Sequence, residues 1–300
     1  MDQLSAIRAF ARVVEAGSFT RAADTLEMPN ATLSKLVQEL EAHLGVRLLQ
    51  RTTRRVTVTA EGQDYYDKTV RILADLEDVD TSFNAVRSKP RGQLRVNIGS
   101  STASDVLIPI LPGFLARYPD IRLDLGVSDR SVDLISDSVD CVIRGGALGD
   151  SSLVARTLGM ANMVTCAAPA YLKHHGTPAY PEELKNGHKL VSYVSAQSGR
   201  AMPFRFRHKG DNIELKLEHR VGVNESNAHL AAAIAGLGII QTFTYAAGPA
   251  IARGELVEVL RRWRPAAYPF HVVYPKNRHL THRLRVFIEW LLESFPERLR

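Results

Sequence analysis

Three segments near the start of the chain place apolar residues three and four positions apart. Residues 2–16, 19–26 and 30–44 show this spacing, which is the period of a helix with one buried face. Gly17 and Gly45 follow the first and third segments, where glycine commonly ends a helix. The pattern therefore predicts three short helices packed around a small core.

The pattern changes to alternation between residues 47 and 59. β-Branched residues are frequent there, with valine and threonine alternating over 56–59, and the segment holds four arginines and no acidic residue, which predicts a basic β wing. Residues 61–88 return to the helical period, and Lys89-Pro90-Arg91-Gly92 breaks this helix. Its apolar stripe has near-heptad spacing and predicts pairing with a partner helix: Tyr66, Val70, Leu73, Leu76, Val79, Phe83 and Val86.

Strands and helices alternate in the rest of the chain, so we expect an α/β fold with a largely parallel sheet covered on both faces. The polar start of the helix near residue 227 includes Ser226, a potential cap. The expected strands are 94–98, 121–127, 141–143, 163–167, 239–240 and 271–274, with a hairpin over 204–217, and the expected helices are 102–117, 132–138, 227–235 and 281–295.

Composition narrows the class of protein only slightly. Of the 300 residues, 45% are hydrophobic and 23% are charged, which is typical of a globular protein with two or three domains. A net charge of +6 is compatible with a polyanionic partner but is only a weak indication of one. The sequence shows no secretion signal and no apolar run long enough to span a membrane, so we expect a cytoplasmic protein without a membrane partner.

The two cysteines, Cys141 and Cys166, lie in apolar segments that read as strands. In a cytosolic protein such cysteines usually stay reduced, although a redox-sensing pair remains an alternative. Two cysteines are too few for a structural zinc site, which uses four clustered ligands, and we expect no metal and no cofactor.

Several separated motifs occur in order along the chain. Those in the first sixty residues are Ser18-Phe19-Thr20-Arg21-Ala22-Ala23-Asp24-Thr25-Leu26, Leu33-Ser34, Leu40-Glu41, Leu44-Gly45-Val46-Arg47-Leu48-Leu49, Arg51-Thr52-Thr53-Arg54 and Thr57-Val58-Thr59. The later ones include Leu111-Pro112-Gly113-Phe114, Tyr118-Pro119, Asp140-Cys141-Val142-Ile143-Arg144 and Gly236-Leu237-Gly238-Ile239. The first set closely resembles the signature of LysR-type transcriptional regulators, and the similarity continues more weakly to the end of the chain. Within that family the chain is most similar to the group that includes the regulators CrgA and DmlR.

The resemblance implies an N-terminal winged helix-turn-helix, a long linker helix that pairs chains, and a two-lobed α/β effector domain like a periplasmic binding protein. The implied partners are double-stranded DNA, a small-molecule effector and further copies of the chain, as a homodimer or homotetramer. On this basis we expect a DNA-binding domain over 1–60, a linker helix and hinge over 61–91, and an effector domain over 92–300, with lobe I at about 92–162 and 272–300 and lobe II at about 163–271.

The third helix is the candidate recognition helix, because such a helix presents polar side chains to base edges and cations to phosphates. By resemblance, Asn30, Ala31, Ser34 and Lys35 match positions at which the family touches DNA. An ordinary solvated helix face is the alternative. The candidate set on this helix is Asn30, Ala31, Thr32, Ser34, Lys35 and Gln38.

Three residues depart from the usual pattern of the family. Pro29 stands where a capping serine is usual, Asn30 where glutamine is usual, and Lys35 replaces a common arginine. A lysine cannot make the flat bidentate contact with guanine that an arginine makes. The operator sequence therefore does not carry over from relatives.

The wing arginines Arg51, Arg54 and Arg55 are the candidate phosphate contacts, with a generic basic surface as the alternative.

Ser100, Ser101 and Thr102 follow a strand and begin a helix, where free backbone amides favour an anionic group. The family's effector site lies between its lobes and includes this junction. By resemblance, Ser128 and Arg144 point to the same site, and Asn224, with Glu225 and Ser226, is a looser candidate from lobe II. The hypothesis is an anionic effector, most naturally a carboxylate, with a helix cap and a structural ion pair as the alternatives for these residues.

Two other functional classes fit less well. An enzyme is disfavoured because His174, His175, His279 and His282 fall in no nucleophile, phosphate-loop or metal motif. A periplasmic solute-binding protein would suit the C-terminal two-thirds but leaves the basic N-terminal domain unexplained. A DNA-packaging protein would leave two hundred residues of α/β domain without a role. We therefore expect a non-enzymatic, effector-controlled regulator.

Overall fold

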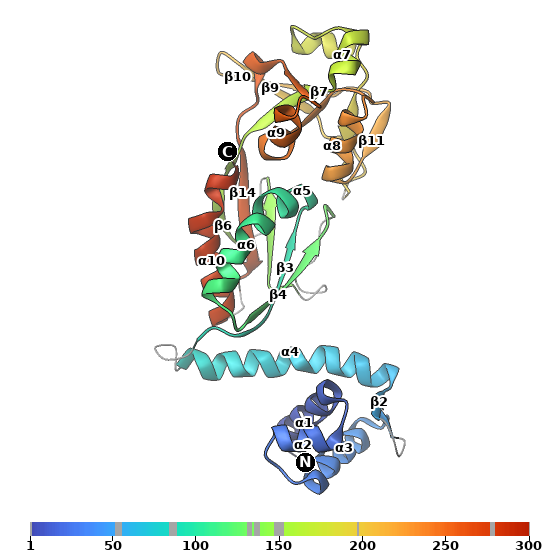
Figure 1. The fold of residues 1–300 in the computed structure, drawn as a ribbon, viewed down its shortest axis with the longest axis vertical. Helices are drawn as coiled ribbons and strands as arrows, with labels where there is room; N and C mark the ends of the chain where they lie inside the picture. The colour runs from blue at the N-terminus through green and yellow to red at the C-terminus, as the bar shows by residue number, and fades with distance from the viewer. Residues whose placement is uncertain are drawn as a thin grey trace. The chain divides into compact units, whose positions relative to one another are not determined.

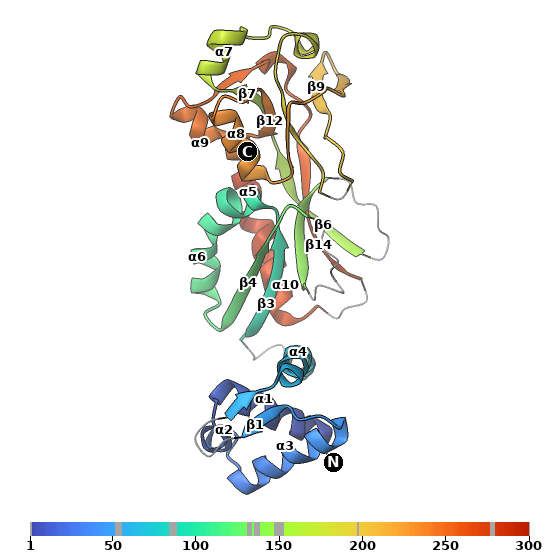
Figure 2. The ribbon, with the colours of Figure 1, turned by 90° about the vertical axis from the view of Figure 1, so that its right-hand side faces the viewer.

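The computed structural model describes residues 2–51, 56–83, 89–130, 134, 139–146, 153–196, 198–276 and 280–299 (Figures 1 and 2). The chain divides into two compact units, Met1–Ser88 and Lys89–Arg300. Each unit has its own hydrophobic core. The last expected residues of the linker helix, 84–88, and most of the helix expected over 132–138 lie outside the described residues.

The three predicted N-terminal helices are confirmed as α1 (Gln3–Ala16), α2 (Phe19–Thr25) and α3 (Asn30–Leu44). The Asp2 side chain accepts a hydrogen bond from the amide of Ser5 at the start of α1, and Ser18 caps α2. α1 and α3 end at glycines with left-handed backbone, where a β-carbon would be strained.

The core of the N-terminal unit is built from the predicted apolar faces of α1 and α3. Phe10 and Leu40 are completely buried there, with Leu48 from the segment after α3. The Glu41 carboxylate accepts hydrogen bonds from the amides of Leu48 and Leu49, at 2.9 and 3.0 Å. This contact turns the chain from α3 into the wing and satisfies two amides that would otherwise lack partners.

The wing is an antiparallel pair, β1 (Leu49–Arg51) with β2 (Val56–Val58), and it leads into α4 (Ala60–Phe83). Part of the apolar stripe predicted for α4 packs against the core of its own unit. Tyr66 packs edge-on against Phe10, and its hydroxyl donates a hydrogen bond to Glu15 at 3.2 Å. Ile72, an apolar residue of α4 outside that stripe, is 57% exposed.

Lobe I of the C-terminal unit contains a five-stranded sheet in the order β4-β3-β5-β14-β6, and it is mixed rather than largely parallel. β3 runs parallel to β4 and β5, whereas β14 runs antiparallel to both β5 and β6. The strands are β3 (Gly92–Ile98), β4 (Ile121–Val127), β5 (Cys141–Gly145), β6 (Leu153–Ala161) and β14 (Tyr268–Pro275), of which β6 was not predicted.

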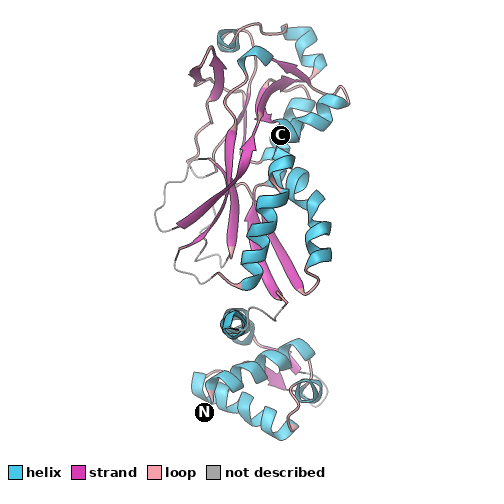
Figure 3. Cartoon of the chain, turned by 90° about the vertical axis from the view of Figure 1, so that its left-hand side faces the viewer, coloured by secondary structure: helices cyan, strands magenta, loops and turns pink. Residues whose placement is uncertain are grey.

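The long helices of lobe I, α6 and α10, lie side by side against the same face of this sheet (Figures 1 and 3). One helical segment runs from residue 100 to 117 and consists of α5 (Ser100–Thr102), a π-helical turn η1 (Ala103–Leu107) and α6 (Ile108–Arg117). α10 (His282–Ser294) begins at its predicted cap, Thr281. Leu134, Val139, Val142 and Val273 form a small cluster on the opposite face.

Lobe II has a separate core around an antiparallel sheet in the order β12-β7-β13. β6 and β7 are separated by a single residue, and β14 returns the chain to lobe I. The elements are β7 (Met163–Ala167), α7 (Pro169–His175), η2 (Pro181–Lys185), β8 (Val191–Tyr193), β9 (Phe204–His208), β10 (Asp211–Leu215), β11 (Val221–Val223), α8 (Ser226–Ile234), β12 (Ile240–Phe243), α9 (Thr244–Ala252), β13 (Val257–Val259) and η3 (Arg261–Trp263), with η4 (Pro296–Leu299) closing the chain in lobe I.

Candidate nucleic-acid interface and lobe junction

The candidate recognition helix, α3, buries one face and leaves the opposite face free for contacts. Leu33, Val37 and Leu40 are fully buried against the core. Pro29 precedes the helix and makes no side-chain cap, as its lack of a hydroxyl predicts. Among the candidate contacts, Asn30, Ala31, Thr32, Lys35 and Gln38 are exposed and Ser34 is half-buried.

Weak contacts hold the candidate polar side chains on α3. The amide nitrogen of the Asn30 side chain lies 3.5 Å from the Thr20 hydroxyl. Lys35 lies 3.9 Å from Glu39, and its side chain is 76% exposed. Such an exposed pair contributes little and is screened by salt, so the lysine can turn toward a phosphate at small cost.

The wing lies beside the start of α4, but little of its basic surface is described. Arg51 is the last residue of β1, whereas Arg54 and Arg55 lie outside the described residues. Thr59 connects the wing to α4: its amide donates to the Leu48 carbonyl, and its hydroxyl accepts from the Gly62 amide at 2.9 Å.

The serine-rich helix start of lobe I lies directly against lobe II. Ser100, Ser101 and Thr102 are all buried. The Ser101 amide donates to the Ser226 hydroxyl at 2.8 Å, and the Thr102 hydroxyl lies 3.0 Å from that of Tyr245 on α9. This helix start therefore joins the lobes through the Ser101 amide and the Thr102 hydroxyl, and we call this region the lobe junction.

Asp129, which sequence reasoning did not single out, is at the centre of the lobe junction. One carboxylate oxygen accepts from the Ser100 amide at 2.8 Å, and the other accepts from the Ser226 amide at 2.5 Å. These two amides belong to different lobes and begin α5 and α8. Burial, followed by the charge and hydrogen bond of Asp129, raises the pKa of Tyr193.

Ser226 was expected to cap α8, and this expectation is wrong. The cap is the neighbouring Glu225, whose carboxylate accepts from the amides of Asn227 and Ala228 at 3.0 and 2.7 Å. Burial opposes ionisation of Glu225, but those two amides and the Ser100 side chain outweigh it and leave its pKa lowered. The Ser226 hydroxyl is thereby free to bind the other lobe.

Arg144 is held in place from two sides. One guanidinium nitrogen, Nη2, donates to the Asn97 side chain at 2.6 Å and to the Arg130 carbonyl at 2.7 Å. The other, Nη1, is buried and has no hydrogen-bond partner among the described residues. Burial lowers the Arg144 pKa, and the Asp129 charge opposes that shift. A cation with an unused donor thus faces the lobe junction.

The remaining predicted effector residues lie near this region without joining it. The Ser128 hydroxyl accepts from the Arg130 amide at 3.1 Å in a local turn. Asn224 is exposed and precedes Glu225. Asp129 lies between Ser128 and Arg130, just after the end of β4, and aspartate and serine are common in such turns. The sequence therefore held no signal that would have separated Asp129 from an ordinary turn aspartate.

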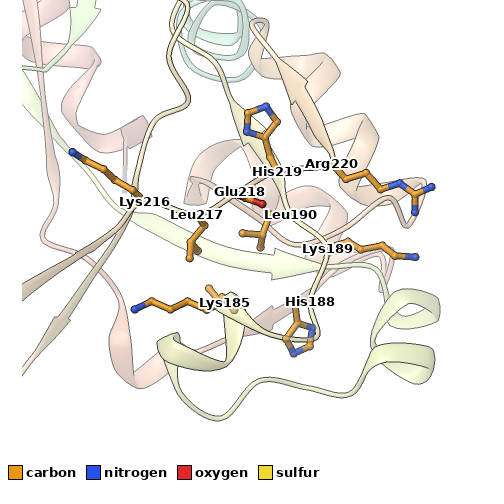
Figure 4. A pocket seen from close by; sticks show the side chains of 10 residues that line it. Lys185, His188, Lys189, Leu190, Lys216, Leu217, Glu218, His219 and Arg220 are labelled. Atoms are coloured by element: carbon orange, nitrogen blue, oxygen red, sulfur yellow. The ribbon is translucent and has the colours of Figure 1, made fainter.

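A basic pocket of about 490 Å³ lies elsewhere in lobe II and contains none of the predicted residues. Leu190 and Leu217 lie between basic side chains in the close view (Figure 4). Its lining is Leu184, Lys185, His188, Lys189, Leu190, Lys216, Leu217, Glu218, His219 and Arg220.

Both cysteines are completely buried in strands, Cys141 in lobe I and Cys166 in lobe II. Burial raises the pKa of both thiols, that of Cys166 to about 12. Because the thiolate is the reactive species, we expect fewer than about one in ten thiols to react with a disulfide reagent in the native protein, and both to react after unfolding. Val127→Cys, at a position that is 48% exposed, supplies the accessible control. Rapid stoichiometric labelling of the unchanged native protein would contradict this expectation.

Among the described residues, no group of three His, Cys, Asp or Glu side chains is placed to hold a metal ion. No helix in the described part of the chain is both long and apolar enough to cross a bilayer.

A small helical unit with a wing, followed by a two-lobed α/β unit, defines the class of helix-turn-helix proteins that carry a ligand-binding domain. The family described as "Bacterial regulatory helix-turn-helix protein, lysR family" matches residues 4–63, and "LysR substrate binding domain" matches residues 87–296. The chain belongs to the LysR family of transcriptional regulators.

Full-length relatives support the same assignment. The chain is 39% identical to a helix-turn-helix transcriptional repressor of Pseudomonas aeruginosa over 99% of its own length and 93% of the relative. The structure of CrgA from Neisseria meningitidis is 34% identical, with a TM-score of 0.62 over 97% of this chain and 98% of that one. The virulence activator AphB of Vibrio cholerae is 27% identical, with a TM-score of 0.60 over 97% and 99%. Since both a repressor and an activator are relatives, the direction of regulation does not carry over.

Proposed function

We propose that this LysR-type regulator binds a specific operator through the exposed face of α3 and is controlled by a small anionic molecule, most simply a carboxylate, at the lobe junction. The observation that carries the effector proposal is Arg144, whose buried Nη1 lacks a partner among the described residues. A guanidinium with a buried, unused N–H donor favours an anionic group beside it. The effector contacts proposed are Ser100, Ser101, Thr102, Ser128, Arg144 and Asn224.

The anion would have to share its donors with the protein's own carboxylate. Asp129 already accepts hydrogen bonds from the Ser100 and Ser226 amides. An effector carboxylate would therefore compete with Asp129 or bind next to it at Arg144. A ligand shifts the arrangement of the lobes only by its different affinity for each arrangement, and such competition supplies that difference.

The test is binding of the full-length protein to the intergenic DNA beside its own gene, followed by titration with dicarboxylates from malonate to adipate. Specific retention against unrelated competitor DNA, together with a change in affinity on adding one of these acids, is expected. Binding no tighter than to competitor would contradict the operator proposal. Unchanged DNA affinity together with no thermal shift for every acid would contradict the anion proposal.

Arg51, Arg54 and Arg55 are proposed to contact phosphates rather than bases. Replacing one of them with alanine should weaken binding to specific and unrelated DNA alike, because phosphate contacts carry no sequence information. The slope of log affinity against log salt should fall by about one unit. Fluorescence anisotropy at several salt concentrations measures this slope, and an unchanged slope for all three variants would exclude the assignment.

Self-association is also proposed, as a homodimer or homotetramer. Ile72 leaves a large apolar side chain on the surface of α4, away from the face that Tyr66 packs on the core. An exposed apolar side chain on a second face of a helix favours packing against a helix of another chain. Sedimentation equilibrium of the full chain measures the number of copies.

A further inference from the structure

We propose that Asp129 is a built-in anion that joins the two lobes, and that a free carboxylate takes its place when its side chain is removed. The inference concerns the same junction as the proposed effector site, and only its consequence for the effector rests on the proposed function.

The two oxygens of Asp129 bind one amide from each lobe. Oδ1 accepts from Ser100 at the start of the lobe I helical segment, and Oδ2 accepts from Ser226 at the start of α8 in lobe II. Asp129 itself follows β4 in lobe I. A hydrogen bond to a charged acceptor is roughly twice as strong as one between neutral groups. This one side chain therefore connects elements that are 29 and 97 residues away in sequence.

Positive groups and hydrogen-bond donors surround the Asp129 carboxylate, as they would surround a bound anion. The positive ends of two helices face it, Arg144 supplies a positive charge, and Tyr193 from lobe II donates a hydrogen bond. Gly99 leaves the space that the carboxylate fills, since a β-carbon at that position would lie 3.0 Å from Oδ1 and 3.7 Å from Nη1 of Arg144. Ser226 adds a second link between the lobes by accepting from Ser101.

Removing the Asp129 carboxylate would leave these hydrogen-bond donors in place without an acceptor. In Asp129→Ala the two amides and the Arg144 charge lose their anion, while the residue that remains is shorter by one carboxylate group. Formate has the size and charge of that missing group. Asp129 is only half-buried, so a small ion can reach the position from solvent.

The consequence is that Asp129 sets what the junction can bind. In the unchanged protein its carboxylate occupies the two helix-start amides. An effector must therefore bind beside Asp129, at the unused Nη1 donor of Arg144, or must displace Asp129 at the cost of its two charge-assisted hydrogen bonds.

Hydrogen–deuterium exchange of the full-length protein tests the proposal, with peptides that cover residues 100–101 and 226–227 as the readout. We expect Asp129→Ala to speed exchange of these amides by about tenfold or more, and 100–200 mM formate to restore most of the protection. Sodium chloride at equal concentration should not. Asp129→Asn keeps the shape but has one accepting oxygen, so it should speed exchange of one of the two peptides and should not respond to formate.

Asp124→Ala is the matched control, because Asp124 is an exposed acid on β4 that pairs with Arg95 and lies away from the amides in question. It should exchange as the unchanged protein does. Unaltered exchange in both Asp129 variants would overturn the proposal. Equal protection of every variant by formate would overturn it as well, because it would show a general salt effect.

A β7 peptide reports whether Asp129→Ala still folds. If that peptide also loses protection, Asp129→Asn alone tests the proposal, through the expected difference in exchange between the Ser100 and Ser226 amides. The assay contains neither DNA nor effector, so its failure leaves the proposed regulation standing, and failure of the DNA titration leaves the exchange result standing.

Discussion

Replacing Thr32 with glutamate is expected to lower the affinity of the protein for its operator at least 100-fold, or by about 2.7 kcal/mol. Thr32 is exposed in the first turn of α3, and its side chain takes part in none of the hydrogen bonds among the described residues, so the change should leave the fold intact. Residues at the start of a recognition helix face base edges between two phosphate chains. A carboxylate there meets acceptors and phosphates, and such like-charge contacts cost several kcal/mol. Anisotropy with labelled operator measures the loss.

Ala42→Glu makes the same change of charge on the same helix and is the control. Ala42 is exposed and lies about 15 Å along the helix axis from Thr32. That separation exceeds the screening length of roughly 8 Å at physiological salt. Its operator affinity should stay within about threefold of the unchanged protein. Equal losses for the two variants would point to net charge rather than to a contact at Thr32, and operator binding by Thr32→Glu within threefold would remove α3 as the reading helix.

The helices of the N-terminal unit were predictable because their determinants are local. The spacing of Ile7, Phe10 and Val14 on α1, and of Leu33, Val37 and Leu40 on α3, defines a buried face without reference to any other segment. Their ends are equally local, since a glycine in left-handed conformation closes α1 and α3. The stripe on α4 shows the limit of such local patterns. Period alone does not tell whether Tyr66 meets a second chain or, as in the structure, Phe10 of its own unit.

The sheet of lobe I was predicted less well because strand direction is a non-local property. Alternating strands and helices favour parallel pairing, and β3, β4 and β5 follow that rule. β14 comes from more than 120 residues after β5 yet lies beside it, antiparallel. β6 was missed because Leu153–Ala161 includes exposed residues among its apolar ones and lacks the clean alternation of a half-buried strand.

The lobe junction was predicted in part. A serine-rich helix start after a strand is a local signal, and it led to Ser100, Ser101 and Thr102. Asp129 and Tyr193 carried no such signal, because their roles arise only when β4 and β8 are brought to the same place. The sequence indicated an anion at this helix start, and in the structure the chain's own Asp129 carboxylate accepts from the Ser100 amide there.

Gly62→Ala is expected to have the largest effect on stability, lowering the free energy of unfolding of the N-terminal unit by about 1–3 kcal/mol or more. A β-carbon at residue 62 would lie 2.0 Å from the Leu48 carbonyl oxygen and 3.0 Å from a Val58 methyl group. The oxygen is backbone, and it already accepts a hydrogen bond from the Thr59 amide at 3.0 Å, so it cannot move without breaking the junction of wing and helix. For a unit of this size the melting temperature should fall by at least about 5 °C.

Gly113→Ala provides a control of opposite sign. Gly113 lies inside α6, and a β-carbon there would meet no atom within 4 Å. Alanine is favoured over glycine in a helix by about 0.5–1 kcal/mol, so this variant should unfold at the same or a higher temperature. If Gly62→Ala melted as the unchanged protein does, the close approach of α4 to the Leu48 carbonyl would not be maintained in solution. If both variants lost stability equally, the cause would be glycine replacement in general rather than the Leu48 carbonyl.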